Sequence, residues 1–112
     1  MRGGRNSLSD ANLERATTDT WEQYRFFGVS VFRAPHDDMV GLSERLGAIR
    51  RRQEVRVARV GSLRLACFEV IPTFAIRAHF SVALPEATPG AFAALRSCFS
   101  EPQSNPGYER GL

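Results

Sequence analysis

The chain has 112 residues, of which 43% are hydrophobic, and 15 basic against 12 acidic side chains give it a net charge of +3. This length suits a single domain, and the apolar content is enough to build a core without disulfides or metal. The charge is too small for a protein that coats DNA, and no apolar run approaches the ~20 residues of a membrane-spanning helix.

Residues 1–8 are rich in glycine and arginine, and we expect them to form a flexible tail. A helix is predicted from Asp10 to Tyr24, with Ser7 and Ser9 as candidate N-caps. Threonines lower its intrinsic helix propensity. We therefore expect the helix to depend on a tertiary contact through Trp21.

Residues 25–32 (RFFGVSVF) carry apolar side chains on both faces, which is typical of a strand covered from two sides. A second helix is predicted over Asp37–Arg52, where an apolar stripe recurs at spacings of three and four. Aspartates at its start and Arg50–Arg52 at its end complement the helix dipole. His36-Asp37-Asp38 is interpreted as a capping sequence, with an acid–base cluster as the alternative.

A meander of antiparallel strands is predicted next. Glu54–Val60 and Leu63–Ile71 are expected to pair through a two-residue turn at Gly61-Ser62. His79–Leu84 reads as the last strand. A final helix follows, with Thr88 as its N-cap and Pro89 at its first helical position.

The predicted fold class is α+β, with the order α-β-α-β-β-β-α and a mainly antiparallel sheet packed by helices. Residues 1–112 are expected to form one domain. Residues 100–112 are polar and rich in proline and glycine, so a second flexible tail is predicted there.

The two cysteines, Cys67 and Cys98, lie in apolar patterns, where a free cysteine behaves as a small buried hydrophobe. Two cysteines do not make a disulfide framework, and the Cys and His spacings match no zinc site. We therefore predict no metal and no cofactor. The first residues lack the apolar core of a signal peptide, so we expect a cytoplasmic protein with no membrane partner.

Glu69 is a candidate acid–base residue. By strict alternation it shares a face with the apolar residues of its predicted strand, from Leu63 to Ile71. Burial of a carboxylate raises its pKa towards the range used in catalysis. The preferred interpretation is structural: a bulge that turns Glu69 outward, or an ion pair with a neighbouring arginine.

Arg77, His79 and Ser81 have a spacing of two, which places them on one face of the predicted strand. This set of side chains would suit phosphodiester cleavage. The arginine would hold the phosphate, the histidine would transfer a proton, and the serine would orient the phosphate or attack it. The alternative, which we prefer, is an ordinary solvent-facing strand surface.

All fifteen basic residues are arginine, whose planar fork binds phosphate or carboxylate at two points. Codon usage in a GC-rich genome also explains the absence of lysine. The candidate nucleic-acid-binding residues surround the predicted hairpin and are Arg56, Arg59 and Arg64. They would bind a phosphate backbone with an affinity that depends on salt. No aromatic residues are clearly interleaved with them for base stacking.

After its first helix, the predicted order β-α-β-β-β-α resembles that of small RelE-type bacterial toxins. Those proteins are basic, cofactor-free ribonucleases that work with Arg, His and Tyr side chains. The chain differs from them in having one helix after its first strand, where they usually carry two. Arg2-Gly3 and Gly28-Val29-Ser30 are similar to NAD-binding elements of ADP-ribosyltransferases, whose late glutamate motif is not evident here.

Three functions follow as expectations. The first is a module that binds RNA or another polyanion, with toxin-like ribonuclease chemistry as an extension. The second is a protein-interaction module of the antitoxin or immunity type, or a homodimer subunit, because RFFGVSVF is rich in aromatic residues for a small domain. The third is an ADP-ribosyltransferase-like toxin that uses NAD.

Overall fold

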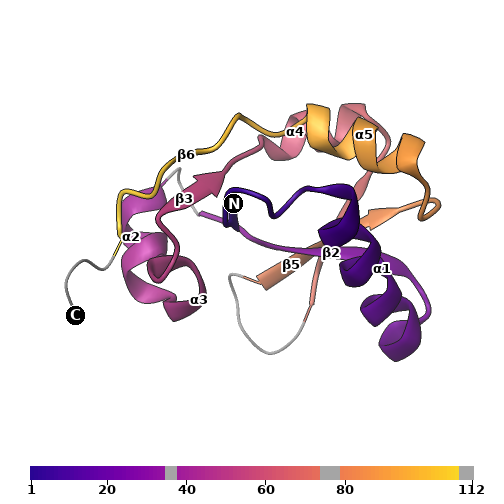
Figure 1. Cartoon of the computed structure of the whole chain (residues 1–112), viewed down its shortest axis with the longest axis horizontal. Coiled ribbons are helices and arrows are strands. Elements are labelled where there is room, and N and C mark those ends of the chain that lie inside the picture. Colours follow the sequence, from indigo (N-terminus) through magenta and orange to yellow (C-terminus); the bar gives the residue numbers. More distant parts are fainter. Residues whose placement is uncertain (35–37, 74–78, 109–112) are drawn as a thin grey trace.

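The computed structural model describes residues 1–34, 38–73 and 79–108 (Figure 1). The predicted α+β class is confirmed, with helices packed on two antiparallel sheets. The helices are α1 (Asp10–Tyr24), α2 (Met39–Arg45), α3 (Gly47–Arg50), α4 (Val60–Leu65) and α5 (Pro89–Ser97). The strands are β1 (Arg2–Gly3), β2 (Phe27–Phe32), β3 (Glu54–Arg56), β4 (Glu69–Pro72), β5 (His79–Leu84) and β6 (Gln103–Ser104). Among these described helices, none is both long and apolar enough to span a membrane.

Helix α1 has the predicted bounds. Its N-cap is Ser9, whose hydroxyl accepts a hydrogen bond from the backbone N–H of Asn12, as serine does at this position. The helix packs through the buried residues Leu13 and Thr17. The predicted contact through Trp21 is partial: this side chain stacks on Phe27 but stays 41% exposed.

The β2–β5–β4 sheet has β5 as its central strand. The register places Val82 between Val29 of β2 and Val70 of β4. Because side chains alternate along a strand, these residues share one face, which α4 and α5 cover (Figure 1). Ser30 and Ser81, which are also paired, lie on the opposite face.

The predicted hairpin at Gly61-Ser62 is wrong, because α4 lies there instead. Its end forms a Schellman motif: the N–H of Phe68 bonds to the carbonyl of Leu63, and Cys67 has a left-handed φ of 67°. Leu63 and Phe68 both enter the core, the apolar contact that accompanies this motif. Cys67 itself is exposed, contrary to its predicted burial.

The predicted helix over Asp37–Arg52 is divided into α2 and α3. Leu46 lies between them with an extended backbone, φ −105° and ψ 112°. The break lets Leu42 of α2 and Ile49 of α3 both point into the same small core. Asp38 caps α2 by accepting a hydrogen bond from the N–H of Gly41; His36 and Asp37 lie outside the described residues.

Parts of both predicted tails lie in the β1–β3–β6 sheet, where β3 pairs with β1 on one side and with β6 on the other. Met1 and Leu8 are buried. At the other end, the buried Asn105 donates hydrogen bonds to the carbonyls of Ile49 and Arg52. Ile49 lies in α3 and Arg52 follows that helix by two residues, where carbonyls have fewer helical partners; the Ile49 carbonyl also accepts from the N–H of Arg52.

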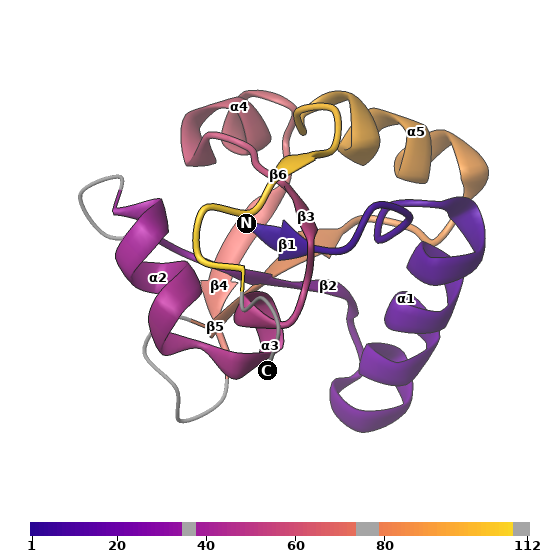
Figure 2. The same cartoon turned by 60° about the vertical axis from the view of Figure 1, so that its left-hand side comes forward.

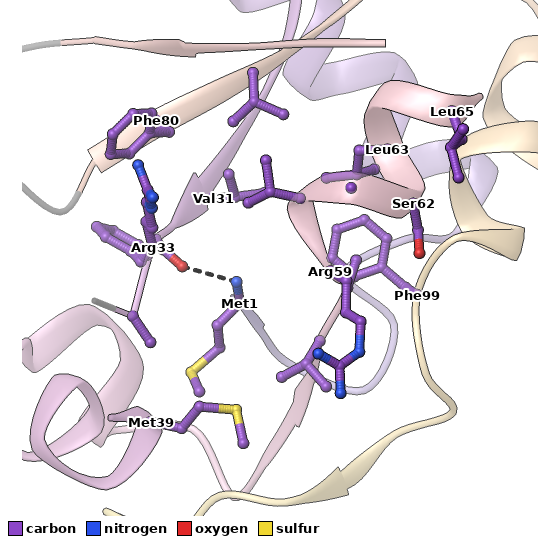
Figure 3. Close-up of a pocket in the computed structure, with 17 residues that line it drawn as sticks. Met1, Val31, Arg33, Met39, Arg59, Ser62, Leu63, Leu65, Phe80 and Phe99 are labelled. Atoms are coloured by element: carbon purple, nitrogen blue, oxygen red, sulfur yellow. Dashed lines mark hydrogen bonds between the residues drawn. The ribbon is translucent and has the colours of Figure 1, made fainter. Parts of the chain in front are cut away.

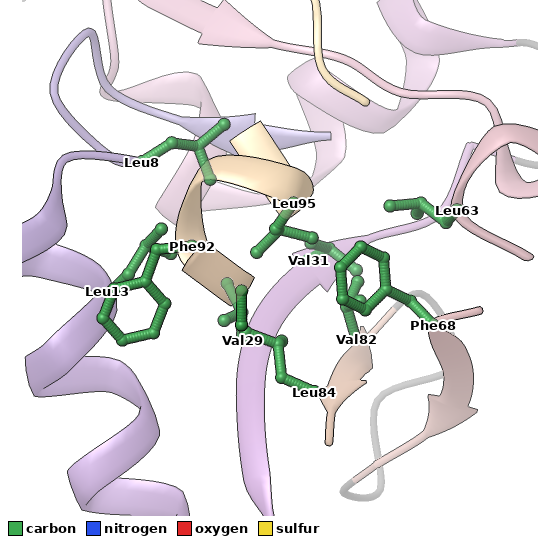
Figure 4. Packing of buried hydrophobic residues seen from close by; sticks show 11 residues of the cluster. Leu8, Leu13, Val29, Val31, Leu63, Phe68, Val82, Leu84, Phe92 and Leu95 are labelled. Atoms are coloured by element: carbon green, nitrogen blue, oxygen red, sulfur yellow. The ribbon is translucent and has the colours of Figure 1, made fainter. Parts of the chain in front are cut away.

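Two hydrophobic clusters form the interior. The larger one lies between the β2–β5–β4 sheet, α1 and α5, and includes Leu13, Val29, Phe92 and Leu95 (Figure 4). The smaller one joins Met1, Leu42, Ile49 and Val55. Figure 2 shows the β1–β3–β6 sheet between the α2–α3 side of the molecule and the α4–α5 side.

Candidate functional site

His79 and Ser81, two of the predicted catalytic residues, lie in β5 and point away from the larger core. Their exposed fractions are only 7% and 2%, so their surface of β5 does not face solvent as the alternation predicted. Glu69 begins β4 and is exposed. Arg77 lies outside the described residues.

A chain of hydrogen bonds joins His79 and Ser81 to two hydroxyls from other segments. The hydroxyl of Ser30, in β2, contacts Nε2 of His79. The hydroxyl of Thr73, directly after β4, lies 2.7 Å from Nδ1 of His79 and 3.0 Å from the hydroxyl of Ser81. The ring of Phe32 stands edge-on to the imidazole at 5.3 Å between centroids.

This environment favours a neutral imidazole. Burial lowers the pKa of His79, against the opposing effect of a hydrogen bond with the backbone of Thr73. The three hydroxyls of the chain supply no negative charge that would hold the ring protonated. A neutral imidazole donates one hydrogen bond and accepts one, which matches its two hydroxyl neighbours.

The pair of Ser30 and His79 has the connectivity of a nucleophile and its base, with Thr73 in the place where catalytic triads often have a carboxylate. The burial of His79 and Ser81 limits substrate access. A buried, satisfied chain of polar groups also has a sufficient structural role, because it fixes the strands in one register.

Sequence reasoning missed Thr73, and it named Ser30 only within the Gly28-Val29-Ser30 resemblance and not as a partner of His79. The available signal for Ser30 was a single hydroxyl within the apolar run RFFGVSVF. Its partnership with His79 depends on the β2–β5 register, and that of Thr73 depends on the β4–β5 pairing. Neither register is encoded by local periodicity.

The predicted nucleic-acid-binding arginines do not flank a hairpin. Arg59 is the N-cap residue of α4 and Arg64 lies in the last turn of that helix, and both are exposed. Arg56 lies in β3, and its Nε donates a hydrogen bond of 3.2 Å to the carbonyl of Arg5. The structure thus places Arg56 with residues of the N-terminal segment.

Four arginines gather where β1 meets β3. Arg2 is paired with Arg56 in the register of these strands. The side chain of Arg52 lies against β1, with its Cγ 2.7 Å from the place that a Cβ on Gly3 would take. We call Arg2, Arg5, Arg52 and Arg56 the β1–β3 arginine cluster.

The charge of this cluster is only partly offset. Burial, and after it the charge of Arg52, lower the pKa of Arg2. Arg2 donates hydrogen bonds to the carbonyls of Ser7 and Ser30, at 3.0 and 2.7 Å, which hold its guanidinium without neutralising it. Glu54 approaches Arg5 at 3.6 Å, a partly exposed pair of small energetic value.

Basic and acidic side chains are concentrated at different ends of the molecule. From Arg45 to Arg64 the chain carries seven arginines and one acidic residue, Glu54. Helix α1 carries four acidic residues and one arginine. Figure 1 shows α1 at one end and α3 with β3 at the other, so an anion meets a favourable potential at the β3 end.

A cleft of about 980 Å³ separates the two hydrophobic clusters. Its walls come from the β2–β5–β4 sheet, the segment from Val57 to Leu65, and Met1 and Met39 (Figure 3). Ligand pockets commonly have volumes of ~300–1,000 Å³. The walls are mainly aliphatic and aromatic, and Val31 and Phe80 present the sheet to this space.

The mouth of the cleft carries positive charge. Arg33 and Arg59 are among its lining residues, and both are exposed. The guanidinium carbon of Arg33 lies 5.8 Å from the centroid of Phe80, within the range of a cation–π contact. The described lining residues include no aspartate or glutamate.

In the described parts of the chain, no three His, Cys, Asp or Glu side chains are grouped so as to hold a metal ion. The chain matches no protein-family model, and comparisons with curated proteins and with solved structures found no similar protein. Its function is therefore inferred from its own side chains.

Proposed function

We propose that the protein binds the phosphate backbone of RNA through the β1–β3 arginine cluster. The supporting observation is the juxtaposition of these four arginines, of which Arg5 has the carboxylate of Glu54 at 3.6 Å. Arg59 and Arg64, exposed on the adjoining helix α4, are candidates for outer phosphate contacts.

Electrostatics gives the reason. Burial lowers the pKa of Arg2 most, and the like charge of Arg52 lowers it further, so Arg2 and Arg52 repel each other. A phosphate placed between guanidinium groups relieves this repulsion and accepts paired, charge-assisted hydrogen bonds. Phosphate binding thus stabilises an arrangement that is unfavourable for the arginines alone.

The expected mode is contact with the backbone and not with the bases. The cluster contains no aromatic side chain on which a base would stack, and phosphate contacts carry no direct sequence information. We expect weak sequence preference and a strong dependence of affinity on salt.

Fluorescence anisotropy with a labelled single-stranded RNA, measured over a salt series, tests the proposal. Each phosphate contact on a single strand contributes about −0.7 to the slope of log K against log salt. The double variant R5Q/R52Q changes two exposed side chains and should make the slope less steep by about 1.4, for two such contacts. R15Q/R25Q removes the same charge from α1 and its C-cap, and should leave the slope unchanged.

Equal losses in R5Q/R52Q and R15Q/R25Q would mean that RNA responds only to net charge. The cluster would then not be the binding site. A double-stranded RNA of equal length, run in parallel, reports whether the cluster distinguishes a flexible strand from a helix.

Ribonuclease activity is an extension of this proposal. His79 would accept the proton of the RNA 2′-hydroxyl, the 2′-oxygen would bond to the adjacent phosphorus as the P–O5′ bond breaks, and the leaving 5′-oxygen would take a proton from water. End-labelled RNA incubated with the protein would then be cleaved, and His79→Gln would abolish cleavage while RNA binding by the arginines persists. Intact RNA after incubation with the wild-type protein would restrict the function to binding.

A second candidate function is self-association through aromatic residues at the end of α1. Trp21 and Tyr24 are 41% and 47% exposed, and the guanidinium of Arg25 lies 5.9 Å from the Trp21 ring. Tryptophan, tyrosine and arginine are the residues enriched at the centres of protein interfaces. Sedimentation velocity over a concentration series should show dimers that Trp21→Ser dissociates; a monomer at all concentrations would exclude this function.

A further inference from the structure

We propose that the cleft between the two hydrophobic clusters binds an anionic amphiphile: an apolar chain that ends in a single carboxylate or phosphate group. This site is distinct from the β1–β3 arginine cluster, because the described lining residues include none of Arg2, Arg5, Arg52 and Arg56.

The first reason is the division of the interior. A domain of this size normally has one contiguous core, yet here Leu63 and Phe80 on one side face Met1 and Met39 on the other across about 980 Å³ of open space. An apolar ligand in this space would join the two clusters and remove their facing surfaces from water.

The second reason is the chemistry of the walls. Val31, Leu63, Val70 and Phe80 provide rigid aliphatic and aromatic surface, while Met1 and Met39 provide flexible thioethers. Methionine adapts to ligands of irregular shape. Such walls suit a flexible hydrocarbon chain, which needs contact area but no particular hydrogen bond.

The third reason is the charge at the mouth, which determines the sign of the ligand. Figure 3 shows Arg33 and Arg59 on different sides of the cleft. Within the described parts of the chain, the guanidinium of Arg59 has no hydrogen-bond or ion-pair partner; only its backbone carbonyl is bonded, to the N–H groups of Ser62 and Leu63. The guanidinium of Arg33 lies over the ring of Phe80. With no carboxylate among the described lining residues, an anionic head group is attracted and a cationic one is repelled.

The fourth reason is Leu65, which lines the cleft and is 88% exposed. A leucine contributes to folding mainly through burial, so this side chain contributes little to the stability of the free protein. It is positioned to cover a bound chain. A substitution at Leu65 therefore separates ligand binding from folding.

The test is isothermal titration of the full chain with dodecanoate below its micelle concentration, with dodecyl phosphate, dodecanol and dodecyltrimethylammonium as comparisons. We expect saturable binding of both anions at one site, and clearly weaker binding of the neutral and cationic chains. R33Q/R59Q should weaken dodecanoate binding about tenfold, the loss expected for one charge-assisted contact. Leu65→Ser should weaken both anions and leave thermal unfolding of the free protein unchanged.

Controls locate the site. R15Q/R25Q matches the charge change of R33Q/R59Q, and Val40→Ser changes another exposed apolar residue, one that does not line the cleft; neither should affect dodecanoate. In methyl NMR spectra, dodecanoate should shift Val57 and Val70, which line the cleft, and not Leu13, which is in the larger core beside α1.

Absence of saturable dodecanoate binding would overturn the proposal, as would equal affinity for the cationic chain or unchanged affinity in R33Q/R59Q. Arg59 belongs to both proposals, so R5Q/R52Q separates them: it changes no residue that lines the cleft and should retain full dodecanoate affinity. Failure of one proposal therefore leaves the other standing.

Discussion

Ser30 and His79 lie 49 positions apart in the chain and are joined by a hydrogen bond between the serine hydroxyl and Nε2 of the imidazole. The register of β2 and β5 brings them together, because Ser30 pairs with Ser81 and Phe32 pairs with His79. The bond links an edge strand to the central strand of the sheet on the face opposite the larger core. A polar chain thus fixes one face, while apolar packing fixes the other.

Because His79 is buried, we expect the free energy of unfolding to decrease in acid. The folded state lowers the pKa of His79 below its ordinary value of 6.5, so the unfolded chain binds a proton first as the pH falls. The contribution of neutral His79 to the free energy of unfolding is complete above pH 6.5, and it decreases as the pH falls through the lowered pKa. Urea unfolding at pH 7.5 and at successively lower pH measures it.

His79→Gln is the matched variant, since glutamine remains polar but does not titrate in this range. Its free energy of unfolding should decrease less between pH 7.5 and pH 5 than that of the wild-type protein. Parallel decreases in the two proteins would show that other groups cause the acid response.

Cys67→Gly should stabilise the protein. Cys67 has a φ of 67°, a left-handed conformation that costs an L-residue about 1–2 kcal/mol, less the ~0.5–1 kcal/mol of chain entropy that glycine loses on folding. The thiol is exposed, so little packing is lost. We expect a gain of about 0.5–1 kcal/mol in urea unfolding. Cys67→Ala removes the thiol but retains the strained φ, and should give no such gain.

Gly61→Ala should also stabilise the protein. Gly61 lies in α4, and a Cβ there meets no atom within 4 Å. Alanine is favoured over glycine within helices by about 0.5–1 kcal/mol, and thermal unfolding should show this gain. Gly28→Ala is the contrasting variant: its Cβ would lie 2.5 Å from the ring of Phe26, so its melting temperature should fall.

Asn105→Ala should destabilise the protein by about 1–3 kcal/mol, because the carbonyls of Ile49 and Arg52 each lose a hydrogen bond. The Asn105 amide donates to the carbonyls of Ile49 and Arg52, each at 2.8 Å, and its oxygen accepts from the N–H of Gly107. Gln103→Ala, at an exposed position of β6, should change the free energy of unfolding little. Similar stabilities of the two variants in chemical unfolding would contradict an anchoring role for Asn105.

The sequence by itself determined the elements whose signals are local. Helix α1 begins and ends where predicted, because Ser9 caps it and its apolar residues recur on one face. Strand β5 follows from alternation, and α5 begins with the predicted Thr88 cap and Pro89 at its first position. In each case the deciding interaction lies within a few residues of the chain.

The tertiary structure decided everything that depends on distant partners. The segment around Gly61 forms a helix because Leu63 and Phe68 pack together in the core. Residues 2–3 and 103–104 join one sheet because β3 pairs with both β1 and β6. Three further features join segments that are distant in the sequence. They are the hydrogen-bond chain of Ser30 and His79, the β1–β3 arginine cluster and the cleft. Periodicity reports which side of an element is apolar, whereas strand register and packing determine which side chains meet.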